Sequence, residues 1–244
     1  MDLGIAGRRA AVAAASRGLG LATAIALAEA GVHVAICGRD AASVDAAVAG
    51  TELVPLVADV SKPDGAQGFV RAARDALGGI DILVTNAGGP PAGRFADITD
   101  LSDYTRAFEL NCLSTIAMCT EAVPAMQAQR WGRVVAITSI AVRQPIPHLI
   151  LSNTARAGVT GFLKTLAREV ARDGVTVNSL QPGLHDTERL RSLPGGADPS
   201  GVPAGTLGRP ADFGAIAAFV CSDQARYLTG TAIQIDGGAY AGLQ

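Results

Sequence analysis

Short apolar runs alternate with longer amphipathic stretches along the whole chain. The apolar runs predict strands near residues 9–14, 33–37, 53–57, 80–84, 134–139, 175–181 and 232–236. The amphipathic stretches predict helices near 19–30, 41–48, 64–77, 100–128, 152–172 and 210–222. Strands that alternate with helices in this way form parallel βαβ units. The pattern therefore predicts an α/β fold, doubly wound around a seven-stranded parallel sheet.

Glycine and proline mark the boundaries of these elements. Gly31, Gly78 and Gly174 follow predicted helices, where a left-handed cap is common. No repeat or linker divides the chain, so residues 1–244 are expected to form a single domain. The segment 187–208 is rich in glycine and proline, and it precedes the last strand. We expect it to form a flexible lid over a substrate site.

Composition removes several classes of function. The net charge of −2 provides no basic surface for nucleic acid. No leader pattern and no apolar run of about 18 residues is present, which favours a cytoplasmic protein without a membrane partner. The four cysteines, at positions 37, 112, 119 and 221, lack the spacing of zinc ligands. Neither a metal site nor a disulfide is expected.

The first strand is followed by the turn AAASRGLG, residues 13–20. Gly18 and Gly20 open the next predicted helix, where backbone N–H groups and the helix dipole attract a phosphate. Taken alone, this turn is equally consistent with a tight connection packed against the sheet.

A second group of polar residues follows the strand predicted at 134–139. Ser139 stands at the end of that strand, and Ser152 and Arg156 share one helix face at i and i+4. Open parallel sheets place their chemistry at the carboxyl ends of the strands. We therefore expect Ser139, Ser152 and Arg156 to lie in the functional site.

Together these motifs resemble one family over nearly the whole chain. The resemblance rests on the glycine turn, TNAG at 85–88, Asn111, ITS at 137–139, NSLQPGLHDT at 178–187, LGRP at 207–210 and YLTGTAIQIDGG at 227–238. Their order and spacing resemble those of short-chain dehydrogenases/reductases, with 3-oxoacyl-carrier-protein-reductase-like members as the nearest match. The resemblance implies a Rossmann fold, oxidoreductase activity on a small-molecule substrate, a nicotinamide cofactor and a homo-oligomer, commonly a tetramer.

The resemblance also assigns cofactor-binding positions. The phosphates would lie on the glycine turn, the adenine against Asp59 and Val60, and the nicotinamide carboxamide against the segment after the sixth strand. The full set is Ser16, Arg17, Gly18, Leu19, Gly20, Arg39, Asp59, Val60, Asn86, Ala87, Gly88, Arg156, Pro182, Gly183, Leu184 and Thr187. The first glycine of the family motif is absent, because Ala13 and Ala14 stand there, and an alanine in this turn is expected to demand negative φ or to crowd it.

Charge favours NADP(H) over NAD(H). An acidic residue after the second strand would bind the ribose hydroxyls of NAD and repel a 2′-phosphate. This chain has Gly38 and then Arg39, and Arg17 can supply a second cation. The alternative is that both arginines are solvated loop charges.

The expected catalytic residues depart from the family. Its tyrosine and lysine positions hold Ser152 and Arg156. A serine hydroxyl is a much weaker acid than a phenol, whose pKa is near 10, and arginine does not relay protons. The resemblance assigns Ser139 to the substrate oxygen and Asn111 to a supporting water chain. His148, one helical turn before Ser152, is a candidate proton donor because histidine titrates near neutrality.

His185 interrupts the loop after the sixth strand and is a weaker candidate donor. The alternative for both histidines is a loop position partly exposed to water. Three functions remain open: an NADP(H)-dependent oxidoreductase acting on a carbonyl or alcohol, a non-oxidative enzyme such as an isomerase or dehydratase on the same scaffold, and a cofactor-binding pseudoenzyme.

Overall fold

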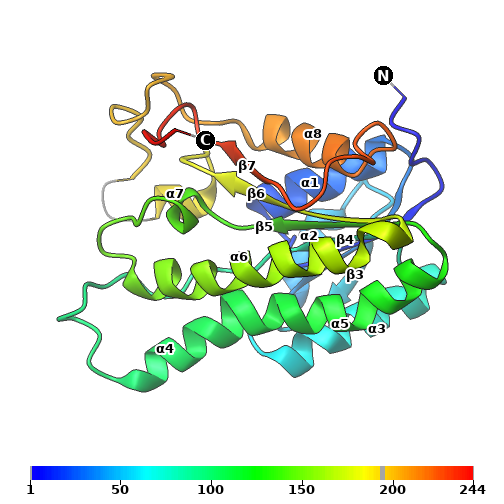
Figure 1. The fold of residues 1–244 in the computed structure, drawn as a ribbon, viewed down its shortest axis with the longest axis horizontal. Helices are drawn as coiled ribbons and strands as arrows, with labels where there is room; N and C mark the ends of the chain where they lie inside the picture. Colours follow the sequence, from blue (N-terminus) through cyan, green and yellow to red (C-terminus); the bar gives the residue numbers. More distant parts are fainter. Residues whose placement is uncertain (1, 193–195, 244) are drawn as a thin grey trace.

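One seven-stranded parallel sheet organises the molecule, in the order β3-β2-β1-β4-β5-β6-β7 (Figure 1). The computed structural model describes residues 2–192 and 196–243. The strands are β1 (Arg9–Val12), β2 (His33–Gly38), β3 (Val54–Val57), β4 (Ile82–Thr85), β5 (Gly132–Ile137), β6 (Val175–Pro182) and β7 (Ala232–Ile235). The predicted doubly wound single-domain α/β fold is confirmed.

Helices cover both faces of the sheet (Figure 1). One layer contains α1 (Gly18–Glu29), α2 (Ala41–Val48) and α8 (Pro210–Val220). The other contains α3 (Pro63–Leu77), α5 (Ser114–Ala128) and α6 (Ile150–Val170), with α4 (Leu101–Phe108) beside α6. Short elements complete the fold: the π-helical turn η1 (Glu109–Leu113), the 3₁₀ turns η2 (Ile140–Val142) and η3 (Ala171–Asp173), and α7 (Glu188–Arg191).

Strand residues alternate between the two layers. Leu83 and Val134 pack among α3, α5 and α6, whereas Val84 and Val135 pack against α1 and α8. These central strands are buried on both sides, which explains why residues 82–84 and 134–137 are continuously apolar. On the α1 side a glycine sets the spacing, because a Cβ built on Gly214 of α8 would lie 2.3 Å from the carbonyl oxygen of Ala22.

The element boundaries correct the sequence prediction in two places that matter for the site. The helix predicted at 100–128 is divided by the π-helical turn η1, in which one turn is wider than an α-helical turn. The strand predicted to reach Ser139 ends at Ile137, and Ser139 instead caps η2. The helix predicted from Ser152 already begins at Ile150, so the i, i+4 relation of Ser152 and Arg156 holds.

The three glycines expected after helices adopt positive φ: 81° at Gly31, 75° at Gly78 and 74° at Gly174. Part of the expected lid, residues 193–195, lies outside the described residues. The described part contains α7 and a bridge between His185 and Gly208. Its mobility stays a prediction. No helix in the described ranges is long and apolar enough to cross a membrane.

Candidate active site

The sequence-predicted site residues gather at the carboxyl edge of the sheet. The strand order reverses between β1 and β4, and the glycine turn follows β1 while Asn86 follows β4. Such a reversal opens a crevice at the carboxyl ends of the strands, where doubly wound folds bind ligands. The Nδ2 of Asn86 donates to the carbonyl oxygen of Ala14 at 3.1 Å, which ties the two loops together.

The glycine turn has the geometry of a phosphate-binding turn. Gly18 has φ 63°, and a Cβ built on Gly20 would lie 2.8 Å from Asn86 Nδ2 and 3.0 Å from the carbonyl oxygen of Ala14. At the N-terminus of α1 the capping residue, Arg17, makes no side-chain cap, and the first turn has no acidic residue. Its N–H groups and the positive end of the helix dipole are therefore available to an anion.

Ala14 contradicts the expectation that alanine in this turn demands negative φ. Its φ is 46°, a left-handed conformation that L-residues with a Cβ rarely adopt. Two contacts hold it there: its N–H donates to Cys37 Sγ at 3.4 Å, and its carbonyl oxygen accepts from Asn86. The turn therefore keeps the shape that glycine would give, with stored backbone strain.

The predicted adenine and ribose positions follow β2, β3 and β4. Asp59 Oδ1 accepts from the N–H of Ser61 at 3.0 Å, and Val60 is buried. Arg39 is exposed, whereas Ser16 is half-buried with its hydroxyl against Gly38. Leu19 and Ala87 are half-buried and Gly88 is exposed at the same edge.

Arg17 is engaged by the segment that carries α7. Its Nη1 lies 3.0 Å from Glu188 Oε2, and both side chains are largely exposed. The methyl group of Thr187 lies 3.8 Å from a Cβ built on Gly18, so this segment closes one side of the turn. Thr187 also caps α7, accepting from the N–H of Leu190 at 3.2 Å.

The loop between β6 and α7 is held against β7. The N–H of Gly183 donates to the carbonyl oxygen of Ile235 at 3.0 Å, and a Cβ on Gly183 would lie 2.8 Å from Asp236 Cα. Pro182 is half-buried and Leu184 is exposed. Of the predicted carboxamide-binding residues, Gly183 thus lies against the end of β7 and Thr187 lies beside the glycine turn.

Asn111 occupies the π-helical turn and is buried. Its Nδ2 donates to the carbonyl oxygen of Gly88 at 2.8 Å, while its Oδ1 has no partner among the described residues. A buried acceptor left without a partner is unusual and is satisfied most simply by an ordered water. α6 lies against this turn, since a Cβ on Gly158 would lie 3.5 Å from Cys112 Sγ.

Ser152 and Arg156 form a hydrogen-bonded pair, and Ser139 stands two residues after the carbonyl that Arg156 contacts. Ser139 Oγ accepts from the N–H of Ala141 at 3.1 Å, as the cap of η2. Ser152 is buried, and its Oγ accepts from Arg156 Nε at 3.2 Å. Arg156 Nη1 donates to the carbonyl oxygen of Ile137 at 3.4 Å, so the guanidinium lies at the end of β5.

The electrostatic setting of Arg156 is unfavourable to its charge. Burial, and to a smaller extent the positive charge of Arg189, lowers the pKa of its guanidinium to about 10. Arg156 remains a cation at neutral pH. Its hydrogen bonds, at 3.2 and 3.4 Å, are long for a charged donor.

The two histidines occupy different environments. His148 is exposed in a left-handed conformation (φ 64°), and its carbonyl oxygen accepts from the N–H of Gly93 at 2.6 Å. His185 is 5% exposed, so the interpretation of a loop residue partly exposed to water is wrong for it. Its ring meets Phe213 edge-to-face at 5.3 Å, and burial lowers its pKa, which makes it a packing residue in this fold.

Sequence reasoning missed Arg189, which lies in α7 two residues after Thr187. A Cβ built on Gly89 would lie 2.3 Å from an Nη atom of Arg189, so the guanidinium rests on the backbone after β4. The only available signal was its position next to a predicted cofactor residue, because periodicity says little about a four-residue helix.

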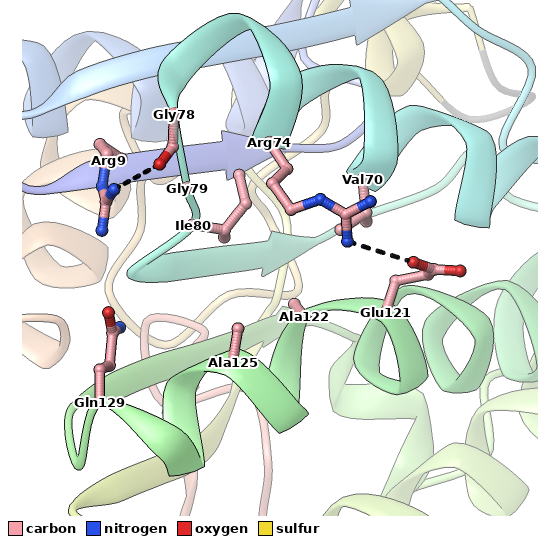
Figure 2. A pocket seen from close by; sticks show the side chains of 10 residues that line it. All are labelled: Arg9, Val70, Arg74, Gly78, Gly79, Ile80, Glu121, Ala122, Ala125 and Gln129. Atoms are coloured by element: carbon pink, nitrogen blue, oxygen red, sulfur yellow. Dashed lines mark hydrogen bonds and ion pairs between the residues drawn. The ribbon is translucent and has the colours of Figure 1, made fainter.

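A separate cavity of about 220 Å³ opens at the amino edge of the sheet, between α3 and α5 (Figure 2). Its charged groups are already paired within the chain. Arg9 Nη1 donates to the carbonyl oxygen of Gly78 at 2.7 Å, and Arg74 Nη1 lies 3.6 Å from Glu121 Oε2. This cavity lies away from the strand ends that carry Ser139 and the glycine turn.

Comparisons with known proteins identify the family that the chain resembles. The family model described as enoyl-(acyl carrier protein) reductase matches residues 13–240. The chain is 35% identical to a 3-oxoacyl-[acyl-carrier-protein] reductase of Synechocystis sp. over 239 residues, covering 94% of this chain and 95% of that protein. It is 34% identical to dehydrogenase/reductase SDR family member 4 of Oryctolagus cuniculus, with 96% and 94% covered.

The chain is also similar to solved structures of reductases. The L-sorbose reductase of Gluconobacter frateurii, determined with NADPH and L-sorbose, superimposes with a TM-score of 0.92 at 29% identity, and both chains are fully covered. A reversal of strand order beside a glycine turn, a capping Ser139 and a family match over most of the sequence lead to one conclusion: the chain belongs to the short-chain dehydrogenase/reductase family of oxidoreductases.

Proposed function

We propose that this protein is an NADP(H)-dependent oxidoreductase that interconverts a carbonyl and an alcohol. The observation that carries the proposal is the hydrogen bonding of two serine hydroxyl groups, those of Ser139 and Ser152. Ser139 Oγ and Ser152 Oγ each accept a hydrogen bond from the protein, and neither O–H has an acceptor within the described chain. Both protons are therefore free to be donated to a substrate oxygen, which is an acceptor.

The cofactor assignment rests on the fit of the glycine turn. The uncapped N-terminus of α1, the close-packed Gly20 and the neighbouring Thr187 suit a dinucleotide phosphate. When bound, NADPH would supply the hydride. Arg39, exposed after β2, is the cation proposed for the 2′-phosphate, and Arg17 can join it by exchanging Glu188 for phosphate.

The proposed roles in proton transfer follow from side-chain acidity. Ser152 and Arg156 stand where we infer the family tyrosine and lysine to lie. Arg156 Nε, bound to Ser152 Oγ, stabilises negative charge developing on a nearby oxygen but does not give up its own proton. Ser152 and water then carry the proton, so slow turnover on simple ketones is expected, because general acid catalysis typically contributes about 10²- to 10⁴-fold. His148, whose side chain is exposed, makes no hydrogen bond to either serine within the described chain and has no role in the proposed mechanism.

The decisive experiment measures NADPH consumption over a panel of ketones and quinones. Wild type should turn over at least one compound, and S139A should lose at least about 100-fold, the usual size of one oxyanion contact. S152Y combined with R156K should raise turnover of simple ketones, with R156K alone as its control. If S139A binds NADPH normally and no compound shows turnover that depends on Ser139, the isomerase, dehydratase or pseudoenzyme alternatives replace this proposal.

Cofactor choice is tested by calorimetry. NADPH should bind more tightly than NADH, with a difference that narrows as salt rises. R39D should remove the preference, while R168D, the same charge change on an exposed residue of α6, should leave it unchanged. Equal affinities of wild type for the two cofactors would contradict the assignment.

We also propose a homo-oligomer, with a tetramer as the expected form. Large apolar side chains stand exposed on elements at the periphery of the sheet, including Leu113 at 42% and Phe219 at 42%. Light scattering at micromolar concentration should give about four times the 24.7 kDa chain mass. A monomeric mass would refute it.

A further inference from the structure

Two arginines lie at the carboxyl edge of the sheet, and no carboxylate of the described residues pairs with either of them. Arg156 reaches the end of β5 from α6, and Arg189 reaches the backbone after β4 from α7. β4 and β5 are neighbours in the sheet, so the two guanidiniums lie beyond the ends of adjacent strands. Their mutual repulsion contributes to the lowered pKa of Arg156.

The acids closest in sequence to Arg189 are already committed elsewhere. Glu188 lies 3.0 Å from Arg17, and Asp186 lies 2.8 Å from Arg191. Within residues 2–192 and 196–243, no carboxylate lies in ion-pair distance of Arg156 or Arg189. Desolvating a cation and placing another beside it is costly, and an anion between them would reverse both costs.

The guanidinium of Arg189 contacts the loop after β4. At Gly18, in the phosphate turn, the side chain within 4 Å of a built Cβ is Thr187. The guanidinium of Arg189 instead rests on Gly89, next to Gly88, whose carbonyl oxygen binds Asn111. Arg189 therefore lies on the loop after β4, the strand next to the one whose end Arg156 contacts.

We propose that Arg189 and Arg156 form a two-guanidinium site for a carboxylate of the substrate, so that the protein acts on keto acids or hydroxy acids in preference to neutral ketones. Gly89 makes the site possible, since any larger residue would occupy the position of the Arg189 guanidinium. Planar guanidiniums match the geometry of a carboxylate. Arg189 is thus a specificity-determining residue, and the inference rests on the proposed oxidoreductase function.

The test measures binding without turnover, by calorimetry on protein saturated with NADP⁺. The probes are pyruvate, acetoacetate and levulinate, each beside its methyl ester, which vary the spacing between ketone and carboxylate. Wild type should bind at least one acid about tenfold or more tightly than its ester. One charge-assisted contact corresponds to about ten- to a hundredfold in affinity.

Two variants and a matched control locate the effect. R189Q should weaken binding of the preferred acid about tenfold or more and leave NADP⁺ affinity within about twofold. G89A keeps the charge of Arg189 but displaces its guanidinium, so it should also weaken binding of the preferred acid. R191Q removes the same charge from the same helix, and it should change neither the affinity for the acid nor the affinity for NADP⁺.

Several outcomes would overturn the inference. One is equal binding of acids and esters at all three spacings. Another is an R189Q protein that loses affinity for NADP⁺ and for inorganic pyrophosphate while keto acids bind as before, since Arg189 would then serve the cofactor phosphates. Preferential binding of an acid without any NADPH consumption would instead remove the oxidoreductase proposal and leave the anion site standing.

Discussion

The two edges of the sheet hold their arginines in opposite surroundings. At the amino edge, Arg9 binds both carboxylate oxygens of Asp81, at 2.8 and 2.9 Å, and Arg133 lies 4.2 Å from the ring centre of Trp131 and 3.4 Å from Asp223. At the carboxyl edge, Arg156 is offered a hydroxyl and a carbonyl oxygen, and its charged neighbour is another arginine.

The difference separates cations whose charge is paired with a carboxylate of the chain from a cation whose charge is not. Charges that stabilise the native state are compensated inside the chain, as the buried Asp81 compensates Arg9. Uncompensated charge lowers stability, and functional sites are where proteins tolerate it. The comparison can be sharpened by removing charges at each edge in turn.

The largest expected effect comes from Asp81→Asn at the amino edge. The change leaves Arg9 without its buried carboxylate, and the free energy of unfolding should fall by about 3 kcal/mol. Denaturant titration measures this, with Asp75→Asn, an exposed acid of α3, as the control. A loss below about 1 kcal/mol would contradict the structural role of this edge.

The same residue predicts a dependence on pH. Burial opposes the charge of Asp81, yet hydrogen bonds from Arg9 and Gln129 hold its pKa below the ordinary value. A lowered folded pKa gives stability that is present above the unfolded pKa, about 3.9, and is lost as pH falls through the folded pKa. The stability difference between wild type and Asp81→Asn should therefore be constant above about pH 5 and shrink below about pH 4.

A paired substitution contrasts the edges directly. Arg133→Met should cost about 2 kcal/mol, because it removes a cation–π contact and hydrogen bonds to the carbonyl oxygens of Gly132 and Ser222. Arg156→Met should leave stability unchanged or raise it by up to about 1 kcal/mol, since it removes a desolvated charge. Thermal unfolding of both variants checks this, and equal losses would erase the distinction between the edges.

The smallest effect concerns backbone strain at the carboxyl edge. Ala14→Gly should raise the free energy of unfolding by about 0.5 to 1 kcal/mol. Glycine adopts φ 46° without the steric cost that alanine bears there, and this relief exceeds the conformational entropy that glycine adds to the unfolded chain. Ala13→Gly is the control, since Ala13 is buried at the end of β1 and is not among the residues with positive φ. A loss of stability on Ala14→Gly would show that the methyl group packs favourably.

The pattern of residues was sufficient to predict the sheet, the helical layers on its two faces and the family. Continuous apolar strands and helices capped by Gly31, Gly78 and Gly174 are local features, and each can be identified from a few neighbouring positions. The i, i+4 pair of Ser152 and Arg156 is of the same kind, and the structure forms its hydrogen bond.

The π-helical turn at Asn111 could not be predicted, because its residues are ordinary helix formers and its width depends on the packing of α6 against it. His185 was misjudged for a related reason: its burial depends on Phe213 and Gly208, which are distant in sequence. Ala14 was expected to reject positive φ, and it adopts that conformation because Cys37 and Asn86 hold it.

The sequence by itself determined the fold, the family and the edge of the sheet where the predicted site residues lie, since these follow from periodicity and from the order of motifs. Only the tertiary structure decided which charges are compensated. Arg9 and Arg156 are the same residue type. Arg9 forms an ion pair with a carboxylate 72 residues away, whereas Arg156 is repelled by the charge of an arginine on a different helix. Electrostatic energy depends on distance in space and on burial, and neither can be obtained from neighbouring positions along the chain.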